Sequence, residues 1–295
     1  MDFTMRKNHA TVFFIILFAP LLLFARPSSG ENETKTKETE PSVSEQESAE
    51  DENPQKCNRA WRKAISKQID LGFFASYEKL PKITFAEISK AEFDRYKSVY
   101  RPKLDPQPSR ITITETTFTI DTNLAKLTFY RENQDLLDRH HACWMVYKGY
   151  YPELKTHALV DASEAEGLNF GTYMLVDSDT NTAYSLASME ADGAVETPLV
   201  SPGNGYLAYY QNSPYKPGTF IGLIRITGDP KRFREYASFS SREYKDSDRF
   251  NSVEDLVWID DDAFAVKAAH IEKFSETRPE PKYFKTKSLR EVKAP

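Results

Sequence analysis

The feature that most constrains this chain is a succession of short β-like segments that begins near residue 110. They are rich in β-branched and aromatic residues, and turn-forming clusters separate them at intervals of about 8–15 residues. No helical pattern of similar strength lies between them, so antiparallel meanders are favoured over a parallel α/β sheet. The segments are ITITETTFTI, LAKLTFY, HACWMVYKGYY, THALVD, TYMLVDS, AYSLAS, GYLAYY, FIGLIRI, DLVWID and AFAVKA.

Residues 57–109 have the residue pattern of helices instead of strands. They predict a helical segment, of one or two helices, packed on the β body. A first helix is predicted over 58–79, where apolar side chains recur at fourfold spacing: Trp61, Ile65, Ile69 and Phe73. A second helix is predicted over 84–99, because Thr84 and Glu87 have the spacing of a capping box.

The first 30 residues have the pattern of a signal peptide. Arg6 and Lys7 precede an apolar stretch over residues 12–25, which is shorter than the roughly 20 residues that a membrane-spanning helix needs. Small residues suited to cleavage follow. We therefore expect a periplasmic or secreted protein with no stable transmembrane segment after cleavage, the alternative being an uncleaved anchor.

Residues 31–56 carry nine acidic and three basic residues and no aromatic residue, which predicts a disordered acidic linker. The chain as a whole has a formal charge of −5, to which the linker contributes about −6 and residues 1–30 about +2. The remainder is nearly neutral and gives no bulk electrostatic sign of nucleic-acid binding. The β-rich domain is predicted over 110–272, and residues 273–295 are interpreted as a basic, loosely packed C-terminal tail.

The chain has two cysteines, Cys57 and Cys143. In an oxidising compartment they are candidates for a disulfide that would clamp the start of the folded body onto its central sheet. Two buried free thiols are the alternative, because the sequence does not reveal the spacing of their Cα atoms.

The region 172–268 carries several motifs with the texture of a propeller blade. They are Leu175-Val176-Asp177, the turn Ser201-Pro202 followed by Gly203 and Gly205, and Trp258 followed by Asp260, Asp261 and Asp262. The region resembles the bacterial exported TolB-type and WD-like β-propeller repeats. The Ser-Pro turn occurs convincingly once, whereas a closed propeller needs about four or more blades. The predicted fold is therefore mainly β, with antiparallel meander sheets of a partial or degenerate propeller type.

Three polar motifs are candidates for metal sites. Asp177 opens a D-x-D-x-N sequence, but the glycine and glutamate of a calcium loop are missing, so a polar turn is favoured. The acidic run Asp260–Asp262 is interpreted in the same way. Adjacent His140 and His141 would point to opposite faces of a strand, which argues against one shared zinc. We predict no metal and no cofactor.

No recognised catalytic signature occurs in the chain. What stands out is the display of tyrosines at strand ends and in turns, and these are the predicted binding residues: Tyr150, Tyr151, Tyr209, Tyr210 and Tyr215. In each Tyr-Tyr pair, one ring is expected to face the core and the other is not.

The sequence leaves the question of enzymatic activity open and favours a non-enzymatic role. The first hypothesis is an exported periplasmic protein that binds a protein or an envelope component, for example as an inhibitor or immunity factor against an envelope-targeting toxin or enzyme. The second is a hydrolase of cell-wall glycans or peptides with a dispersed acidic site, for which Asp260–Asp262 and Glu164 are candidates. The third is a structural module of the envelope.

Overall fold

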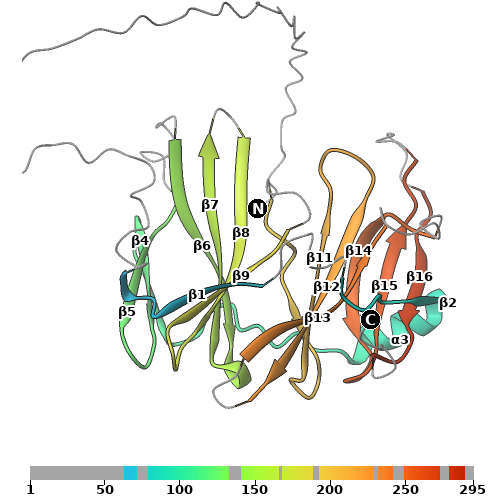
Figure 1. The fold of residues 1–295 in the computed structure, drawn as a ribbon, viewed down its shortest axis with the longest axis horizontal. Coiled ribbons are helices and arrows are strands. Elements are labelled where there is room, and N and C mark those ends of the chain that lie inside the picture. The colour runs from blue at the N-terminus through green and yellow to red at the C-terminus, as the bar shows by residue number, and fades with distance from the viewer. Residues whose placement is uncertain are drawn as a thin grey trace, which may run out of the picture. The chain divides into compact units, whose positions relative to one another are not determined.

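A computed structural model describes residues 63–71, 79–132, 141–165, 168–188, 193–228, 232–241, 249–272 and 279–289 (Figure 1). All of them belong to the unit Ser48–Pro295. The described residues are mainly in β-strands, which confirms the predicted class. The predicted signal peptide, the acidic linker, Cys57 and His140 lie outside the described residues.

The strands form four sheets, numbered here in chain order. Sheet 1 has the order β3-β4-β5, with β3 (Ile111–Ile113), β4 (Thr117–Asp121) and β5 (Lys126–Tyr130). Sheet 2 has the order β1-β9-β8-β7-β6, with β1 (Lys67–Leu71), β6 (His141–Tyr151), β7 (Thr156–Ala165), β8 (Leu168–Asp177) and β9 (Thr182–Leu186). A short 3-10 helix, η2 (Pro152–Leu154), joins β6 to β7.

Sheet 3 has the order β10-β11-β12-β13, with β10 (Leu199–Val200), β11 (Tyr206–Asn212), β12 (Thr219–Thr227) and β13 (Arg232–Ser240). Sheet 4 has the order β14-β15-β16-β2, with β2 (Phe85–Ile88), β14 (Ser252–Trp258), β15 (Phe264–Ala269) and β16 (Lys282–Thr286). Consecutive strands pair antiparallel within each meander, as the turn spacing predicts. Strand β1 pairs parallel to β9.

The inner sheets are buried on both faces, which explains why their strands are almost continuously apolar. In β7, Ala158 and Val160 belong to the core between sheets 2 and 3, whereas Leu159 belongs to the core between sheets 1 and 2. Every residue of β9 is buried. Neighbouring strands therefore supply side chains to two cores at once.

Sheets 3 and 4 share a third core, which is rich in aromatic rings. Sheet 3 contributes Ala208, Ile221, Leu223, Ala237 and Phe239, and sheet 4 contributes Leu256, Trp258, Phe264, Val266, Ala268 and Phe284. The Trp258 indole N–H donates to the Leu199 carbonyl at 2.8 Å and so ties the two sheets together.

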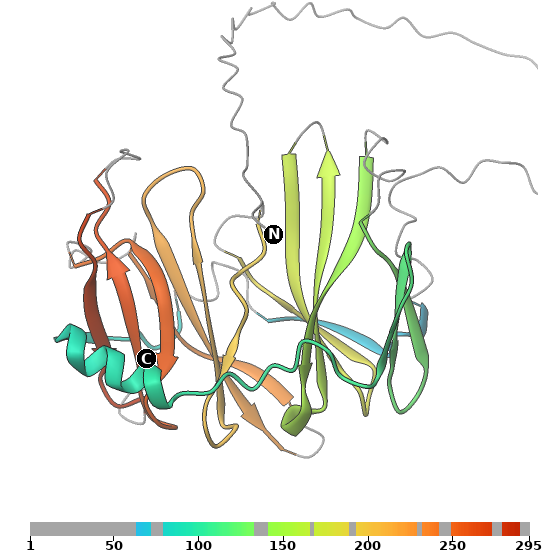
Figure 2. The same cartoon turned by 180° about the vertical axis from the view of Figure 1, so that it is seen from behind.

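Helix α3 (Lys90–Val99) covers the other face of sheet 4, beside β14–β16 in Figure 2. Phe93 is buried there against Val257 and Ala265. The outward face of sheet 1 is polar instead, and its Thr119 and Thr128 hydroxyls are hydrogen-bonded at 2.8 Å. The described residues form no closed barrel or propeller.

The prediction that residues 57–109 are helical is wrong in part, because strands β1 and β2 lie in this range. Of the helix expected over 58–79, residues 63–64 are helical and residues 67–71 form strand β1 instead, while 58–62 and 72–78 lie outside the described residues. The helix expected over 84–99 begins only at Lys90, where the Ser89 hydroxyl accepts from the Glu92 N–H at 3.1 Å. The expected capping-box residues lie in or next to β2, because pairing with β16 determines the local structure.

Residues 79–88, called the strap below, run along the edges of two sheets. The Ile83 N–H donates to the Ser238 carbonyl of β13 at 2.8 Å, and the Ser238 N–H donates to the Pro81 carbonyl at 3.0 Å. The strap then continues as β2 at the edge of sheet 4. It thus covers strand edges that would otherwise be open to pairing with another chain.

The C-terminal region is also better ordered than a loosely packed tail. Strand β16 lies between β15 and β2, with Phe284 buried in the core. Leu289 is also fully buried. The β body therefore extends beyond the predicted limits of 110–272 at both ends. No helix in the described part of the chain is long and apolar enough to cross a membrane.

Candidate binding pocket at the strap

The turn from Ser201 to Gly205, which carries the blade-like motif, is a structural junction. The buried Ser201 hydroxyl accepts from the Gly205 and Tyr206 N–H groups at 3.2 Å each. Asn204 adopts a left-handed conformation with φ 63°, and the Gly203 N–H donates to the Asp261 carboxylate. The motif therefore connects sheet 3 to the acidic turn of sheet 4.

The carboxylates of Asp260, Asp261 and Asp262 all accept hydrogen bonds within the protein. Asp260 accepts from the Asp262 N–H at 2.7 Å, and Asp262 accepts from the Ser288 hydroxyl at 2.6 Å. Glu164 lies in β7 of sheet 2, on a different sheet from these three acids. The geometry thus gives the acidic run a structural role in a turn.

The motif that begins at Asp177 is a polar turn, as predicted. One oxygen of the Asp177 carboxylate accepts from the Asp179 N–H at 2.9 Å and the Thr180 N–H at 2.8 Å. Asn181 then takes a left-handed conformation, with φ 53°. Among the described residues, no cluster of three or more histidine, cysteine or acidic side chains could hold a metal.

Three of the five predicted binding tyrosines lie in the cores. Tyr150, Tyr151 and Tyr209 are buried, whereas Tyr210 is half-buried and Tyr215 is 58% exposed. The expectation that only one ring of each pair faces the core is wrong for Tyr150 and Tyr151, which are both buried. Sheet 2 is covered on both faces, so successive side chains of a strand there point alternately into two different cores.

Tyr210 lines a small pocket of about 260 Å³ between sheets 3 and 4. Burial raises the pKa of its phenol, and the nearby carboxylates of Glu196, Asp255 and Glu254 raise it further. The phenol therefore stays protonated at neutral pH. The Glu254 carboxylate, which lines this pocket, already has a charged partner: its Oε2 lies 2.8 Å from Nζ of Lys267.

His157 and Cys143 both lie in sheet 2, in β7 and β6. His157 is fully buried beside Tyr147 and Tyr150, and burial lowers its pKa to about 4. Cys143 lies in β6 opposite Ser163 of β7. Since Cys57 is outside the described residues, the disulfide remains a prediction.

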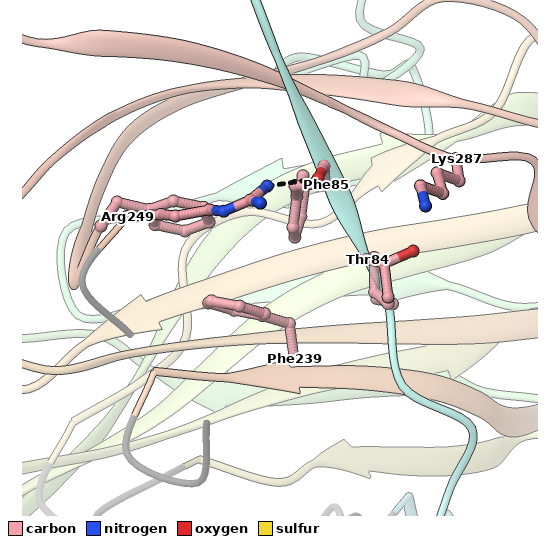
Figure 3. Close-up of a pocket in the computed structure, with 7 residues that line it drawn as sticks. Thr84, Phe85, Phe239, Arg249 and Lys287 are labelled. Atoms are coloured by element: carbon pink, nitrogen blue, oxygen red, sulfur yellow. Dashed lines mark hydrogen bonds between the residues drawn. The ribbon is translucent and has the colours of Figure 1, made fainter. Parts of the chain in front are cut away.

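A second pocket, of about 190 Å³, lies where the strap passes from sheet 3 to sheet 4 (Figure 3). We call it the strap pocket. Its lining combines an apolar floor with two basic side chains: Ile83, Thr84, Phe85, Phe239, Arg249, Phe250 and Lys287. The Phe85 ring packs edge-on against Phe239 and Phe250, with both centroid distances at 5.3 Å.

The two basic residues lie on either side of the strap in Figure 3. One guanidinium N–H of Arg249 donates to the Phe85 carbonyl at 2.7 Å, which holds the side chain at the pocket. The Lys287 backbone N–H donates to the Thr84 carbonyl at 3.0 Å, while its exposed ammonium group has no hydrogen-bond partner among the described residues. An aromatic floor with cations at its rim suits an apolar group that carries an anion.

Sequence reasoning missed this pocket. Its residues come from the strap, from β13, from the segment before β14 and from the segment after β16, so no local motif groups them. The closest signal is the sequence Arg249-Phe250, which joins a cation to a large ring. Reading Phe85 as part of a helix also concealed its position at a sheet edge.

Comparisons of the chain with models of protein families, with curated protein sequences and with solved structures found no match.

Proposed function

We propose that the protein is an exported, periplasmic binding protein that recognises a protein or an envelope component through the strap pocket. The observation that carries the proposal is the pairing of Arg249 and Lys287 with a floor of phenylalanine rings. Inhibition of an envelope-targeting toxin or enzyme, as an immunity factor, is one form that this function can take.

The size of the pocket supports binding to part of a larger ligand. Sites that enclose a whole small molecule usually measure about 300–1,000 Å³, whereas the strap pocket measures about 190 Å³. It has room for one side-chain-sized group, with the rest of the ligand outside. A macromolecular partner that inserts one apolar group fits this geometry.

We also propose that the sheets are related to propeller blades, although they do not close into a ring in the described part of the chain. Support comes from sheets 3 and 4, in which successive antiparallel strands form a meander and an N-terminal segment lies along the outer edge. The likeness to TolB-type repeats remains part of this proposal. Since propellers and related sheets serve many functions, the fold itself carries no argument about activity.

The test is capture of partners from envelope extract with the mature protein. The binding variant R249Q/K287Q is compared with R234Q/K282Q, which removes the same charge from exposed positions outside the pocket. We expect one stoichiometric partner with the wild type and the control, and at least tenfold less with the binding variant. Thermal denaturation checks that both variants are folded.

The proposal fails if no stoichiometric partner is recovered, or if the binding variant retains as much partner as the control. Fractionation of cells with an antibody against the folded body tests export separately, because a cytoplasmic location contradicts the predicted signal peptide.

A further inference from the structure

The edge of sheet 4 beside the strap pocket has unused backbone groups. In an antiparallel pair, alternate residues exchange hydrogen bonds with the neighbouring strand. Thr84 is bonded to Lys287, so Ala86 and Ile88 are the next residues that bond toward β16. The backbone groups of Phe85 and Glu87 consequently point to the open side of β2.

These outward groups have few partners in the described part of the chain. The Phe85 carbonyl accepts from Arg249, but among the described residues the Phe85 and Glu87 N–H groups donate to no acceptor and the Glu87 carbonyl accepts from no donor. Strand β2 is the last strand of its sheet. It therefore offers a short template on which an extended peptide can add as a further strand.

The open edge leads directly into the strap pocket, because Phe85 belongs to both. Arg249 has guanidinium N–H groups beyond the one that it uses on Phe85, and Lys287 supplies a second cation on the other side of the strap. Backbone donors and acceptors, a pocket for one side chain and two cations thus adjoin one another around Phe85.

We propose that the strap binds the C-terminal segment of a partner protein. In this arrangement the last peptide residues pair with β2, the final apolar side chain enters the pocket, and the terminal carboxylate is held by Arg249 and Lys287. This inference rests on the proposed binding function and names the chemistry of the partner.

A peptide accounts for more of the site than an acyl chain does. A fatty acid could place its carboxylate on the same two cations, but its long chain needs an apolar trench and uses no backbone hydrogen bonds. The strap pocket is small, and the polar edge of β2 adjoins it. The geometry therefore matches a peptide end with one bulky apolar side chain.

The test measures binding of synthetic peptides to the mature protein by fluorescence anisotropy. The probe is a labelled Thr-Val-Thr-Phe with a free carboxylate, and it is compared with the same peptide as a C-terminal amide. We expect the amide to bind on the order of tenfold or more weakly, since it cannot form charge-assisted hydrogen bonds with the two cations. Equal binding of the two peptides would overturn the inference.

A backbone variant tests strand addition separately. Glu87→Pro removes an outward N–H that β16 does not use, and proline is tolerated at such edge positions. Glu87→Ala is the matched control, because it removes the same carboxylate and keeps the N–H. We expect the proline variant to bind the free-acid peptide at least fivefold more weakly than the alanine variant, with similar melting temperatures.

Should Glu87→Pro unfold the protein, a peptide N-methylated at its second-last residue provides the same test from the ligand side. Unchanged affinity for that peptide would contradict strand addition. Laurate is the third ligand. If laurate binds and the free-acid peptide does not, the peptide inference falls while the strap pocket survives as a binding site. If neither binds, the proposed function loses its site as well.

Discussion

Acidification is expected to destabilise the folded protein through His157. Its side chain is fully buried in β7, with Nδ1 3.2 Å from the Tyr147 hydroxyl and its ring centroid 4.6 Å from that of Tyr150. Burial, with a smaller contribution from the charge of Arg110, lowers the pKa to about 4 against opposing contributions from Asp121. The folded state thus favours the neutral imidazole.

The sign of the effect follows from the two protonation equilibria. In the unfolded chain the histidine pKa is about 6.5. Above that pH the imidazole is neutral in both states, so its burial in the neutral form does not reduce the free energy of unfolding through protonation. As the pH falls from about 6.5 toward 4, the unfolded state binds a proton that the folded state does not. A pKa difference of about 2.5 corresponds to a loss of roughly 3 kcal/mol in the free energy of unfolding by pH 4.

The assay is urea denaturation of the wild type and of His157→Asn at pH 7.5 and pH 4. Asparagine has a polar group near the position of Nδ1 and does not titrate. The wild type should lose about 3 kcal/mol more than His157→Asn between the two pH values, whereas the exposed control His270→Asn should behave as the wild type does. An equal loss in the wild type and in His157→Asn would refute the reasoning.

Two further predictions concern packing and the cysteines. Gly222→Ala should destabilise the protein by about 1–3 kcal/mol in the same assay, because an added Cβ would lie 2.4 Å from Cζ of Tyr209. Gly205→Ala, which meets nothing within 4 Å, should change stability far less. Peptide mapping without reduction should recover Cys57 linked to Cys143, and two titratable thiols in the denatured, unreduced protein would contradict that pairing.

Much of the β architecture could be predicted from the sequence because its signals are local. Strands such as Thr219–Thr227 are continuous runs of apolar and β-branched residues bounded by turns. The turn after Asp177 likewise follows from side-chain oxygens that bond nearby backbone groups.

The errors occurred where distant contacts determine the structure. Residues 84–87 fit a capping box, yet they pair with β16 about 200 positions away, and no local pattern carries that information. The prediction that only one ring of Tyr150 and Tyr151 faces the core holds only if one face of the sheet is open. The strap pocket was missed for the same reason, since it requires four segments to meet.

The central claim, that the strap pocket binds an apolar anion, is tested most directly by an NMR titration with N-acetylphenylalanine. This small acid combines one aromatic side chain with a carboxylate. The account predicts saturable shifts in the amide and side-chain signals of Phe85, Phe239, Arg249 and Lys287, and little change on sheet 1. Saturable shifts confined to residues outside the pocket would contradict it. So would the absence of shifts at every concentration tested.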